Sequence, residues 1–390
     1  MELGFGPEYD TFREEVQTFL ASHWPPPDGM APASAEARGA FAEAATRQGY
    51  FRRSVPRRYG GSEQPADNVK AEIIRQEFKR AGAPSELRDA GITMLIPTLL
   101  QWGSEAQNER FIPRTLTGEF RWAQGFSEPG AGSDLASLQT RGELRGDRWI
   151  INGQKVWSTH AYRANYMFAL IRTEPDAPKH AGISYLMIDM KQPGVTVRPL
   201  TQMTGRSEFC EVFFDDAETP ADWLVGERGQ GWTISRSTLK HERSALSGLT
   251  WTDAMIRDLV RLARETMRSG RPMIEDSAIR DELAAIEGDS MALTYSTYRA
   301  TSMSVHGQDP GLFGGMSKIT STNLAQRIAK LAAVIMGDDM LAASGPRAKW
   351  VERFMISLSM AIAGGTSNIQ RNIIAERNLG LPREPKAVKP

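Results

Sequence analysis

A polar, glycine-rich segment at residues 124–134, QGFSEPGAGSD, contains the first residues in this chain that could bind a ligand. Small residues and a proline lie around Ser127, Glu128, Ser133 and Asp134. A segment of this kind exposes backbone N–H groups and hydroxyls to a polar or anionic ligand. Its composition alone fits a polar loop at a domain boundary equally well.

A second candidate is NGQKVWSTH at residues 152–160, where Trp157 stands beside Ser158 and Thr159. A tryptophan next to hydroxyl groups can form one wall of a site for a planar cofactor. A tryptophan in a β domain more often lies in the core. Both interpretations of Trp157 are compatible with the sequence.

A third stretch, IAGGTSNIQRNIIAER at residues 362–377, contains two adjacent glycines, Gly364 and Gly365, that interrupt an apolar run. Paired glycines are costly inside a helix, at about 1 kcal/mol each relative to alanine. They suit a place where another group must approach the backbone closely. After them a helical pattern resumes, with isoleucines on one face.

Other common kinds of site lack their sequence motifs. None of the five histidines forms an H-x-x-x-H pair and Cys210 has no cysteine neighbour, so no metal site is predicted. Cys210 is instead expected in the core of a β domain. The sequence has no G-x-S-x-G nucleophile motif, no Walker loop and no G-x-G-x-x-G after a strand.

Composition narrows the class of protein further. Lys plus Arg and Asp plus Glu both number 47 in 390 residues, which argues weakly against nucleic-acid binding. A single cysteine excludes an intrachain disulfide and fits a reducing compartment. The N-terminus lacks an apolar signal core, and no apolar run approaches the ~20 residues of a membrane span. We therefore expect a cytoplasmic protein without a membrane span.

The elements that must position these residues follow the order helical, β, helical. Apolar spacing predicts an N-terminal helical domain over residues 1–121. Short β-prone runs and two turn signals, Arg-Gly-Asp and Asn-Gly, predict a middle β domain over residues 122–235. Helical periodicity over residues 236–390 predicts a C-terminal helical bundle. The fold class is α+β, and a cleft where these domains meet is a usual place for a ligand.

Local signals predict some of the helix boundaries. WPPPDG at residues 24–29 should end a first helix, and Asp67 or Asn68 is a plausible N-cap of a later one. Residues 94–113 read as two short helices broken by proline and glycine. LVRLARETMRSG at residues 259–270 has helical periodicity and few helix breakers, which predicts a helix.

Three segments, FSEPGAGSD, INGQKVWST and GGTSNIQRNIIAER, resemble the three signatures of the acyl-CoA dehydrogenase family in the right order and spacing. The resemblance covers nearly the whole chain, including the helical–β–helical order. It implies a flavoprotein that uses FAD to remove the α and β hydrogens of an acyl-CoA thioester. It also implies a homodimer or homotetramer that passes electrons to an electron-transfer flavoprotein.

The resemblance implies roles for individual residues. Ser127 occupies the position of a hydroxyl beside the flavin ring, while Trp157 and Thr159 match residues that wall the flavin and hydrogen-bond near N5. Ser133 and Arg243 match residues on the substrate side, near the pantetheine and the acyl-CoA channel. The positions expected to contact FAD are Phe126, Ser127, Gly132, Trp157, Ser158, Thr159, Arg268, Thr366 and Asn368.

Two positions depart from the family pattern at the far end of the FAD. Many members have an arginine that meets the FAD pyrophosphate, and the aligned residue here is Thr266. Arg268 or Arg271 could reach the same phosphate instead. A family glutamine at the adenine end appears as Val334. These changes leave the expected flavin-ring site intact and weaken the case for the usual contacts at the AMP end.

The catalytic base is a further departure. Many members have a catalytic glutamate at the position of Gly364, because an α-proton must leave as hydride passes from Cβ to flavin N5. A minority place the glutamate on another helix, immediately before the arginine matched by Arg243, and that position here is Glu242. We therefore predict Glu242 as the base. In isolation, Glu242 reads as a surface residue paired with Lys240 or Arg236.

Gly364 keeps its backbone N–H, which in the family holds the thioester carbonyl together with a flavin ribityl hydroxyl. This N–H can still stabilise an enolate-like oxygen. The bare Ala363–Gly364 pair would also widen the acyl pocket, so we expect a bulky, branched or cyclic acyl group.

Two other readings remain open. A related flavoenzyme, such as an acyl-CoA oxidase or a desulfinase, can lack the usual base. One subunit of a heteromeric dehydrogenase would tolerate the changes at Thr266 and Val334.

Overall fold

The structure is a computed structural model that describes residues 6–26, 31, 34–246, 250–305, 308–309, 311–342 and 344–383. For residues 242–246, 250–251 and 304–305 it describes the backbone alone. Contacts divide the chain into two compact units. Unit 1 comprises Met1–Leu200 with Glu208–His241, and unit 2 comprises Thr201–Ser207 with Glu242–Pro390. The domain boundaries predicted at residues 121/122 and 235/236 stay predictions.

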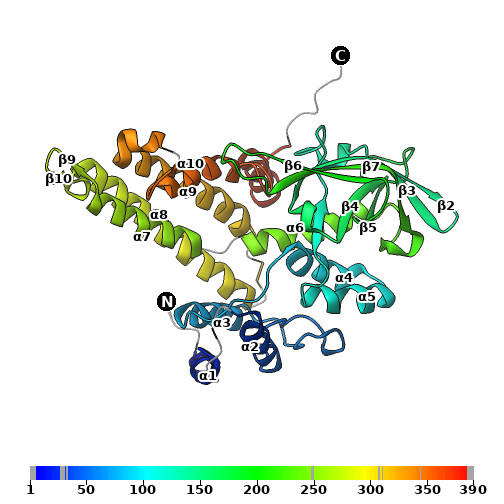
Figure 1. Cartoon of the computed structure of the whole chain (residues 1–390), viewed down its shortest axis with the longest axis horizontal. Helices are drawn as coiled ribbons and strands as arrows, with labels where there is room; N and C mark the ends of the chain where they lie inside the picture. Colours follow the sequence, from blue (N-terminus) through cyan, green and yellow to red (C-terminus); the bar gives the residue numbers. More distant parts are fainter. Residues whose placement is uncertain are drawn as a thin grey trace, which may run out of the picture. The chain divides into compact units, whose positions relative to one another are not determined.

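The N-terminal part of unit 1 is helical. Its helices are α1 (Pro7–His23), α2 (Ala35–Arg47), α3 (Asn68–Arg80), α4 (Ile96–Trp102) and α5 (Glu105–Leu116), with a π-helical turn at Gly91–Leu95 (Figure 1). Helix α1 ends at His23, directly before WPPPDG, as predicted. Asp67 is the N-cap of α3, because its Oδ1 accepts the N–H groups of Val69 and Lys70, both at 2.9 Å.

Residues 94–113 form two helices, but only the glycine separates them. A Cβ at Gly103 would lie 2.7 Å from the carbonyl oxygen of Leu99, so glycine suits the end of α4. Ser104 then opens α5 with a capping box. The break expected at a proline is wrong: Pro97 lies in the first turn of α4, where proline is tolerated, and Pro113 lies inside α5.

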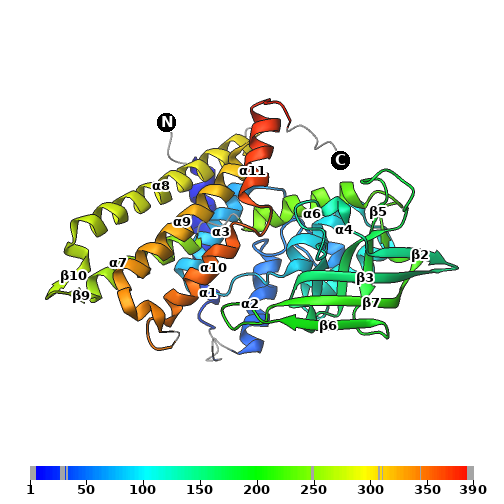
Figure 2. The same cartoon turned by 90° about the horizontal axis from the view of Figure 1, so that it is seen from above.

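Unit 1 also contains an eight-stranded sheet within the described residues (Figure 2). Its strands are β1 (Trp122–Gly125), β2 (Arg141–Arg145), β3 (Arg148–Thr159), β4 (Tyr166–Arg172), β5 (Ile183–Asp189), β6 (Val195–Leu200), β7 (Phe209–Pro220) and β8 (Leu224–Val225). Their order is β6-β7-β3-β2-β4-β5-β8, and β1 runs parallel to β4. The long strand β3 pairs antiparallel with β2 on one side and β7 on the other.

One of the two predicted turn signals is a turn and the other is not. Arg-Gly-Asp supplies Gly146 and Asp147, the two-residue loop of the β2–β3 hairpin. Asn152–Gly153 lies inside β3, where the pairing with β7 is irregular. The Asn-Gly prediction is wrong because β3 keeps a partner on both sides there. Gly153 has a φ of 145°, and a Cβ on it would lie 2.7 Å from Thr140 Cα, so the position requires glycine.

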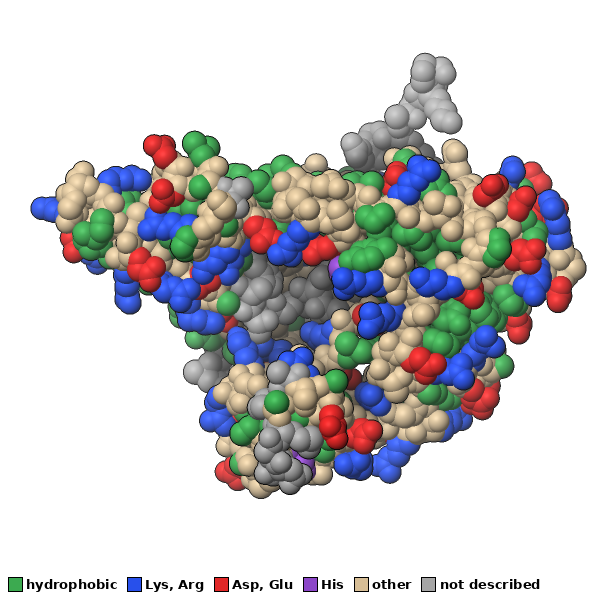
Figure 3. All heavy atoms as spheres, viewed as in Figure 1, with side chains coloured by type: hydrophobic (Ala, Val, Ile, Leu, Met, Phe, Trp, Pro, Cys, Tyr) green, Lys and Arg blue, Asp and Glu red, His purple; other side chains and the backbone are tan. Residues whose placement is uncertain are grey.

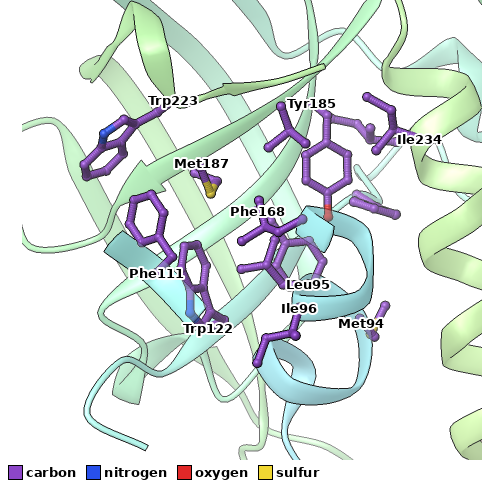
Figure 4. Close-up of a cluster of buried hydrophobic side chains, with 14 of the residues drawn as sticks. Met94, Leu95, Ile96, Phe111, Trp122, Phe168, Tyr185, Met187, Trp223 and Ile234 are labelled. Carbon is purple, nitrogen blue, oxygen red and sulfur yellow. The ribbon is translucent and has the colours of Figure 1, made fainter. Parts of the chain in front are cut away.

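The core of unit 1 joins the helices to the sheet (Figure 4). Phe111 of α5 packs edge-on against Trp122 and Trp223, with ring centroids 5.4 and 5.1 Å apart. Other buried members include Leu95, Ile96, Phe168, Tyr185, Met187 and Ile234. Cys210 is also fully buried, in a second cluster of the sheet, as expected. Helices α4 and α5 therefore share an apolar interior with the sheet, whereas α1, α2 and α3 pack around a cluster of their own.

Unit 2 is a helical bundle preceded by α6 (Gly231–Leu246), which begins in unit 1. The further elements are α7 (Thr250–Glu265), β9 (Met267–Arg268), β10 (Arg271–Pro272), α8 (Ser277–Val305), α9 (Phe313–Met336), α10 (Ala348–Met360) and α11 (Ser367–Ile373). Helices α7, α8, α9 and α10 lie side by side around a buried core (Figures 1 and 2). The α+β fold class predicted from the sequence is confirmed.

The predicted helix over residues 259–270 ends at Glu265. Residues 267–272 form a small antiparallel hairpin instead. Its two loop residues, Ser269 and Gly270, have φ values of 51° and 78°, which a helix does not allow. Among the described residues, no helix combines the length and the apolar character that crossing a membrane requires.

Candidate functional site

The two candidate segments of the β domain lie side by side in unit 1. The N–H of Val156 donates to the carbonyl oxygen of Ser127 at 2.9 Å. This contact places Ser127 next to the end of β3 that carries Trp157 and Thr159. We call residues 126–128 and 155–159 together the β3 site.

A buried ion pair joins the two segments of the β3 site. Lys155 Nζ lies 2.7 Å from Glu128 Oε1 and also donates to the carbonyl oxygen of Phe126 at 3.3 Å. Lys155 is 0% exposed and Glu128 is 9% exposed. The Glu128 carboxylate accepts two more hydrogen bonds, from the N–H groups of Gln139 at 2.6 Å and Thr140 at 2.9 Å. The pair therefore ties the loop before Pro129 to the middle of β3.

Burial and charge act against each other on both partners. Burial raises the pKa of Glu128, but Lys155 and the hydrogen bonds from residues 139 and 140 outweigh it, so the pKa is lowered overall. For Lys155, burial outweighs the attraction of Glu128 and lowers the pKa to about 8. The lowered pKa keeps the Glu128 carboxylate ionised at neutral pH. The sequence motifs contained these two residues, but nothing in the sequence paired them.

Trp157 is exposed, with 60% of its surface accessible, so the interpretation as a core residue is wrong. Between Lys155 and Ser158, β3 carries one residue more than the facing part of β7. Such a bulge changes the direction in which the Trp157 side chain points. Trp157 has a φ of 63°, a left-handed conformation that costs a non-glycine residue about 1–3 kcal/mol and is typical of functional sites. Thr159 is exposed as well.

The other predicted residues of this region differ in exposure. Ser158 is fully buried, and its Oγ has no hydrogen-bond partner among the described residues. Phe126 is buried and packs edge-on against Phe168, with ring centroids 5.9 Å apart. Gly132 and Ser133 are exposed. Ser158 and Phe126 therefore support the β3 site from within, whereas Gly132 and Ser133 can meet a ligand directly.

An open groove of about 490 Å³ adjoins the β3 site and shares Glu128 with it. Its other lining residues are Pro129, Gly130, Ser137, Gln139, Thr140, Arg141, Asn152, Gly153 and Gln154. Two of the polar side chains bond to β7: Asn152 to Asp216 at 2.8 Å and Gln154 to Glu211 at 2.9 Å. Sequence reasoning missed this groove, because its walls come from three separate segments.

The paired glycines form a tight turn between α10 and α11 in unit 2. Gly364 and Gly365 have φ values of 64° and 95°, both in the left-handed region. Gln370 of α11 donates from Nε2 to the carbonyl oxygen of Gly364 at 3.3 Å. A Cβ on Gly365 would lie 2.6 Å from the same Nε2. The group that approaches this backbone from within the chain is therefore the Gln370 amide.

Two backbone N–H groups of this turn have no hydrogen-bond acceptor within the described part of the chain. Neither the Gly364 nor the Gly365 N–H has an acceptor among the residues that the structure describes. Thr366 is the N-cap of α11, and its Oγ1 accepts the N–H of Ile369 at 3.2 Å. Asn368 is exposed and accepts from Arg371 at 3.1 Å. These N–H groups are therefore available as donors, and the role predicted for position 364 stays a prediction.

The two positions that depart from the family pattern lie near Arg268. Arg268 Nη2 donates to the carbonyl oxygen of Val334 at 3.0 Å. Thr266 is 7% exposed, and its buried Oγ1 has no partner among the described residues, so it cannot replace a phosphate-binding arginine. Exposed arginines gather around α7 and the β9–β10 hairpin (Figure 3): Arg257, Arg261, Arg264, Arg268 and Arg271.

The predicted base lies at a point where the structure describes only the backbone. Positions 242 and 243 belong to α6, but the side chains of Glu242 and Arg243 lie outside the described residues. The pKa of the preceding His241 is lowered by burial and by the charge of Lys240, which favours a neutral imidazole. No cluster of histidine, cysteine and carboxylate side chains within the described part of the chain could hold a metal ion.

Comparison with known proteins gives a consistent result over the whole chain. Models of the acyl-CoA dehydrogenase N-terminal, middle and C-terminal domains match residues 6–119, 123–217 and 229–379. Acyl-CoA dehydrogenase IpdE1 of Mycobacterium tuberculosis is 42% identical over 314 residues, which cover 80% of each chain.

Two solved structures are similar over almost their full length. One is the ChsE4–ChsE5 complex from Mycobacterium tuberculosis, with 27% identity, a TM-score of 0.78 and coverage of 98% of this chain and 100% of that chain. The other is the Tcur3481–Tcur3483 steroid ACAD, with 25% identity, a TM-score of 0.79 and the same coverage.

Proposed function

Because this chain belongs to the acyl-CoA dehydrogenase family, an oxidoreductase family, we propose that it uses FAD to dehydrogenate the CoA thioester of a bulky, branched or cyclic acid. The observation that carries the proposal is Trp157, an exposed indole held in a strained backbone conformation beside the exposed Thr159 hydroxyl. A chain retains such strain where it serves a function. A flat aromatic surface next to a hydroxyl suits a planar, hydrogen-bonding cofactor.

Each unit, taken by itself, offers side chains whose chemistry suits part of an FAD molecule. In unit 1, Trp157 would wall the ring system, and Ser127, Gly132 and Thr159 would offer hydrogen-bonding groups. In unit 2, Thr366 and Asn368 would contact the cofactor, and Arg268, exposed within an arginine-rich surface, would bind its phosphates. When bound, FAD supplies the hydride acceptor of the reaction. Protein that is colourless and takes up no FAD on reconstitution would contradict this proposal.

The turn at Gly364 would bind the thioester carbonyl of the substrate. Its N–H group has no acceptor among the described residues, and a backbone donor aimed at a carbonyl stabilises the negative charge that develops there. Ser133 and Arg243 would contact the CoA moiety on the substrate side. With the carbonyl held in this way, the α-carbon becomes more acidic and a carboxylate can remove its proton.

Glu242 is the residue we propose as that base. Gly364 has no side chain, so the position that carries the glutamate in many family members cannot act. Glu242→Gln should keep the flavin absorbance and bind substrate, yet slow anaerobic flavin reduction by at least ~10²-fold, the lower scale for a general base. Glu265→Gln, at the exposed end of α7, is the matched control. Reduction of Glu242→Gln at the parent rate would overturn the assignment.

The substrate shape follows from the small residues before α11. Ala363 and Gly364 carry one methyl group between them, where a bulkier pair would narrow the acyl pocket. One of the solved relatives is a steroid ACAD, which supports a bulky acyl group. Ala363→Leu should reduce kcat/KM for branched or cyclic acyl-CoAs more than for linear ones. A parent enzyme that prefers linear octanoyl-CoA would contradict the proposal.

A second candidate function is that of one subunit in a heteromeric dehydrogenase. Both solved relatives carry names that combine two components, and the buried Thr266 cannot take the role of a phosphate-binding arginine. Purifying the chain alone distinguishes the two. One FAD per chain in a homodimer or homotetramer that reduces an electron-transfer flavoprotein supports the first proposal. Persistent failure to hold FAD without a second protein supports the heteromeric dehydrogenase. Rapid oxygen consumption without an added electron acceptor would instead indicate an acyl-CoA oxidase.

A further inference from the structure

Gln370 is a buried side chain, 3% exposed, wedged between the glycine turn and helix α9. Its Nε2 donates to the carbonyl oxygen of Gly364 at 3.3 Å. On the other side, a Cβ placed on Gly315 of α9 would lie 3.6 Å from the Gln370 Oε1. The glutamine amide therefore occupies a space bounded by a glycine of α9 and by the turn.

The fit of this amide depends on the glycines of the turn. A Cβ on Gly365 would come within 2.6 Å of Nε2, far inside normal contact distance. The φ values of 64° and 95° at Gly364 and Gly365 are also conformations that glycine adopts freely. That freedom is a disadvantage for a catalytic peptide group, because a glycine pair has no preferred orientation of its own. A contact from another part of the chain must therefore define the orientation of this peptide group.

Two other contacts define the ends of the turn. Lys318 of α9 donates from Nζ to the carbonyl oxygen of Met360, the last residue of α10. The N–H of Ser367 donates to the carbonyl oxygen of Ala361 at 3.1 Å. Between these points, the Gln370 amide contacts the peptide that joins Gly364 to Gly365. The neighbouring N–H groups of both glycines remain without acceptors among the described residues.

We propose that Gln370 is a positioning residue that fixes the Gly364–Gly365 turn and so orients the Gly364 N–H toward the thioester carbonyl. The proposal rests on the function proposed above for that N–H. The amide holds the Gly364 carbonyl oxygen and so fixes the plane of the peptide that joins Gly364 to Gly365. With this plane and the end of α10 both held, Gly364 can rotate about φ and ψ only within a narrow range, and that rotation sets the direction of its own N–H. A side chain without a donor leaves this rotation free. A carboxylate in its place repels the carbonyl oxygen.

The test compares Gln370→Met with a matched control, Gln326→Met. Gln326 of α9 also donates from Nε2 to a backbone carbonyl oxygen, that of Ser357, at 3.3 Å. We expect Gln370→Met to keep FAD and to bind acyl-CoA with unchanged affinity. Anaerobic flavin reduction should slow about tenfold, part of the 10²–10³-fold loss seen when a whole oxyanion donor is removed. Gln326→Met should reduce flavin at the parent rate.

A second readout does not depend on activity. Amide hydrogen exchange of a peptide covering residues 361–368 should be faster in Gln370→Met than in the parent, and unchanged in Gln326→Met. Gln370→Glu, of the same size, adds a pH test and replaces the methionine variant if that variant does not fold. Its flavin-reduction rate relative to the parent should rise as pH falls, because the introduced carboxyl becomes a donor once protonated.

The outcomes separate this inference from the proposed function. A parent protein that reduces no flavin with any acyl-CoA contradicts the proposed function, and the exchange experiment still decides whether Gln370 fixes the turn. In an active enzyme, parent-like flavin reduction by Gln370→Met overturns the inference, whatever its exchange rate. Parent-like exchange over residues 361–368 overturns it as well.

Discussion

The β3 site in unit 1 and the glycine turn in unit 2 are both short irregular segments held in a defined conformation, but different contacts hold them. The β3 site uses a buried ion pair, Lys155–Glu128, inside a paired sheet. The turn uses two left-handed glycines and a neutral amide, that of Gln370. An electrostatic attraction therefore holds the β3 site, whereas close packing and one hydrogen bond to a carbonyl oxygen hold the glycine turn.

This difference predicts where each region is vulnerable. Removing one partner of a buried ion pair leaves an unpaired charge in a poorly solvated place, which costs several kcal/mol. Removing a neutral donor leaves one carbonyl oxygen unpaired, with a penalty of about 1–3 kcal/mol at most. Removing one partner of the Lys155–Glu128 pair should therefore reduce folding stability strongly, whereas removing the Gln370 donor should reduce turnover more than stability.

The largest effect is expected for Lys155→Met. The substitution leaves Glu128 buried and unpaired, so the free energy of unfolding should fall by about 3–5 kcal/mol. Urea unfolding followed by far-UV circular dichroism measures it. Lys179→Met is the control, because Lys179 pairs with Asp134 at the surface, where the side chains are 48% and 66% exposed. An exposed pair contributes about 0–1 kcal/mol. Equal losses of unfolding free energy in the two variants would contradict the view that the buried pair contributes more to stability than the exposed pair.

A smaller loss, about 1–3 kcal/mol, is expected for Gly365→Ala, because alanine is strained at a φ of 95° and its Cβ meets Gln370. Gly288→Ala is the opposite control. Gly288 lies in α8 with open space around a Cβ, so alanine there should stabilise by about 0.5–1 kcal/mol. Thermal unfolding of both variants checks the sign. A Gly365→Ala protein as stable as the parent would show that the turn can rearrange.

Combining Lys155→Met with Glu128→Gln should recover most of the stability that Lys155→Met loses. The double variant has no unpaired charge, and the new amide oxygen can still accept an N–H from Gln139 or Thr140. We expect a net cost of about 1 kcal/mol relative to the parent, since replacing both partners of a buried pair is often nearly neutral. Additive losses in the double-mutant cycle would mean that the two residues do not act as a pair.

The smallest effect is a dependence on acid pH. The pKa of Glu128 is lowered from its ordinary value of 4.5 in the folded state, so its contribution to stability is complete above that value. The contribution is lost as pH falls through the lower, folded-state pKa. The stability difference between the parent and Glu128→Gln should therefore shrink between about pH 5 and acid denaturation. Parallel pH profiles would argue against a lowered pKa.

Local patterns in the sequence predicted the family, the α+β fold class and many element boundaries. The motifs around Ser127, Trp157 and Gly364 are short and contiguous, so one stretch of sequence contains each of them. The N-cap at Asp67 and the β2–β3 hairpin were predictable for the same reason, because their determinants lie within a few residues. The Asn-Gly signal failed because a neighbouring strand, not the dipeptide, determines whether the chain turns there.

Long-range contacts decided what the local patterns left open. Trp157 could be core or surface, and a bulge against β7 makes it exposed. Lys155 and Glu128 are 27 residues apart in the sequence, and only the packing of a loop against β3 makes them partners. The sequence likewise predicted a close neighbour at the paired glycines Gly364 and Gly365, without showing which residue it is. Propensity and spacing act over one or two turns of chain, whereas a partner is determined by which surfaces the fold buries together.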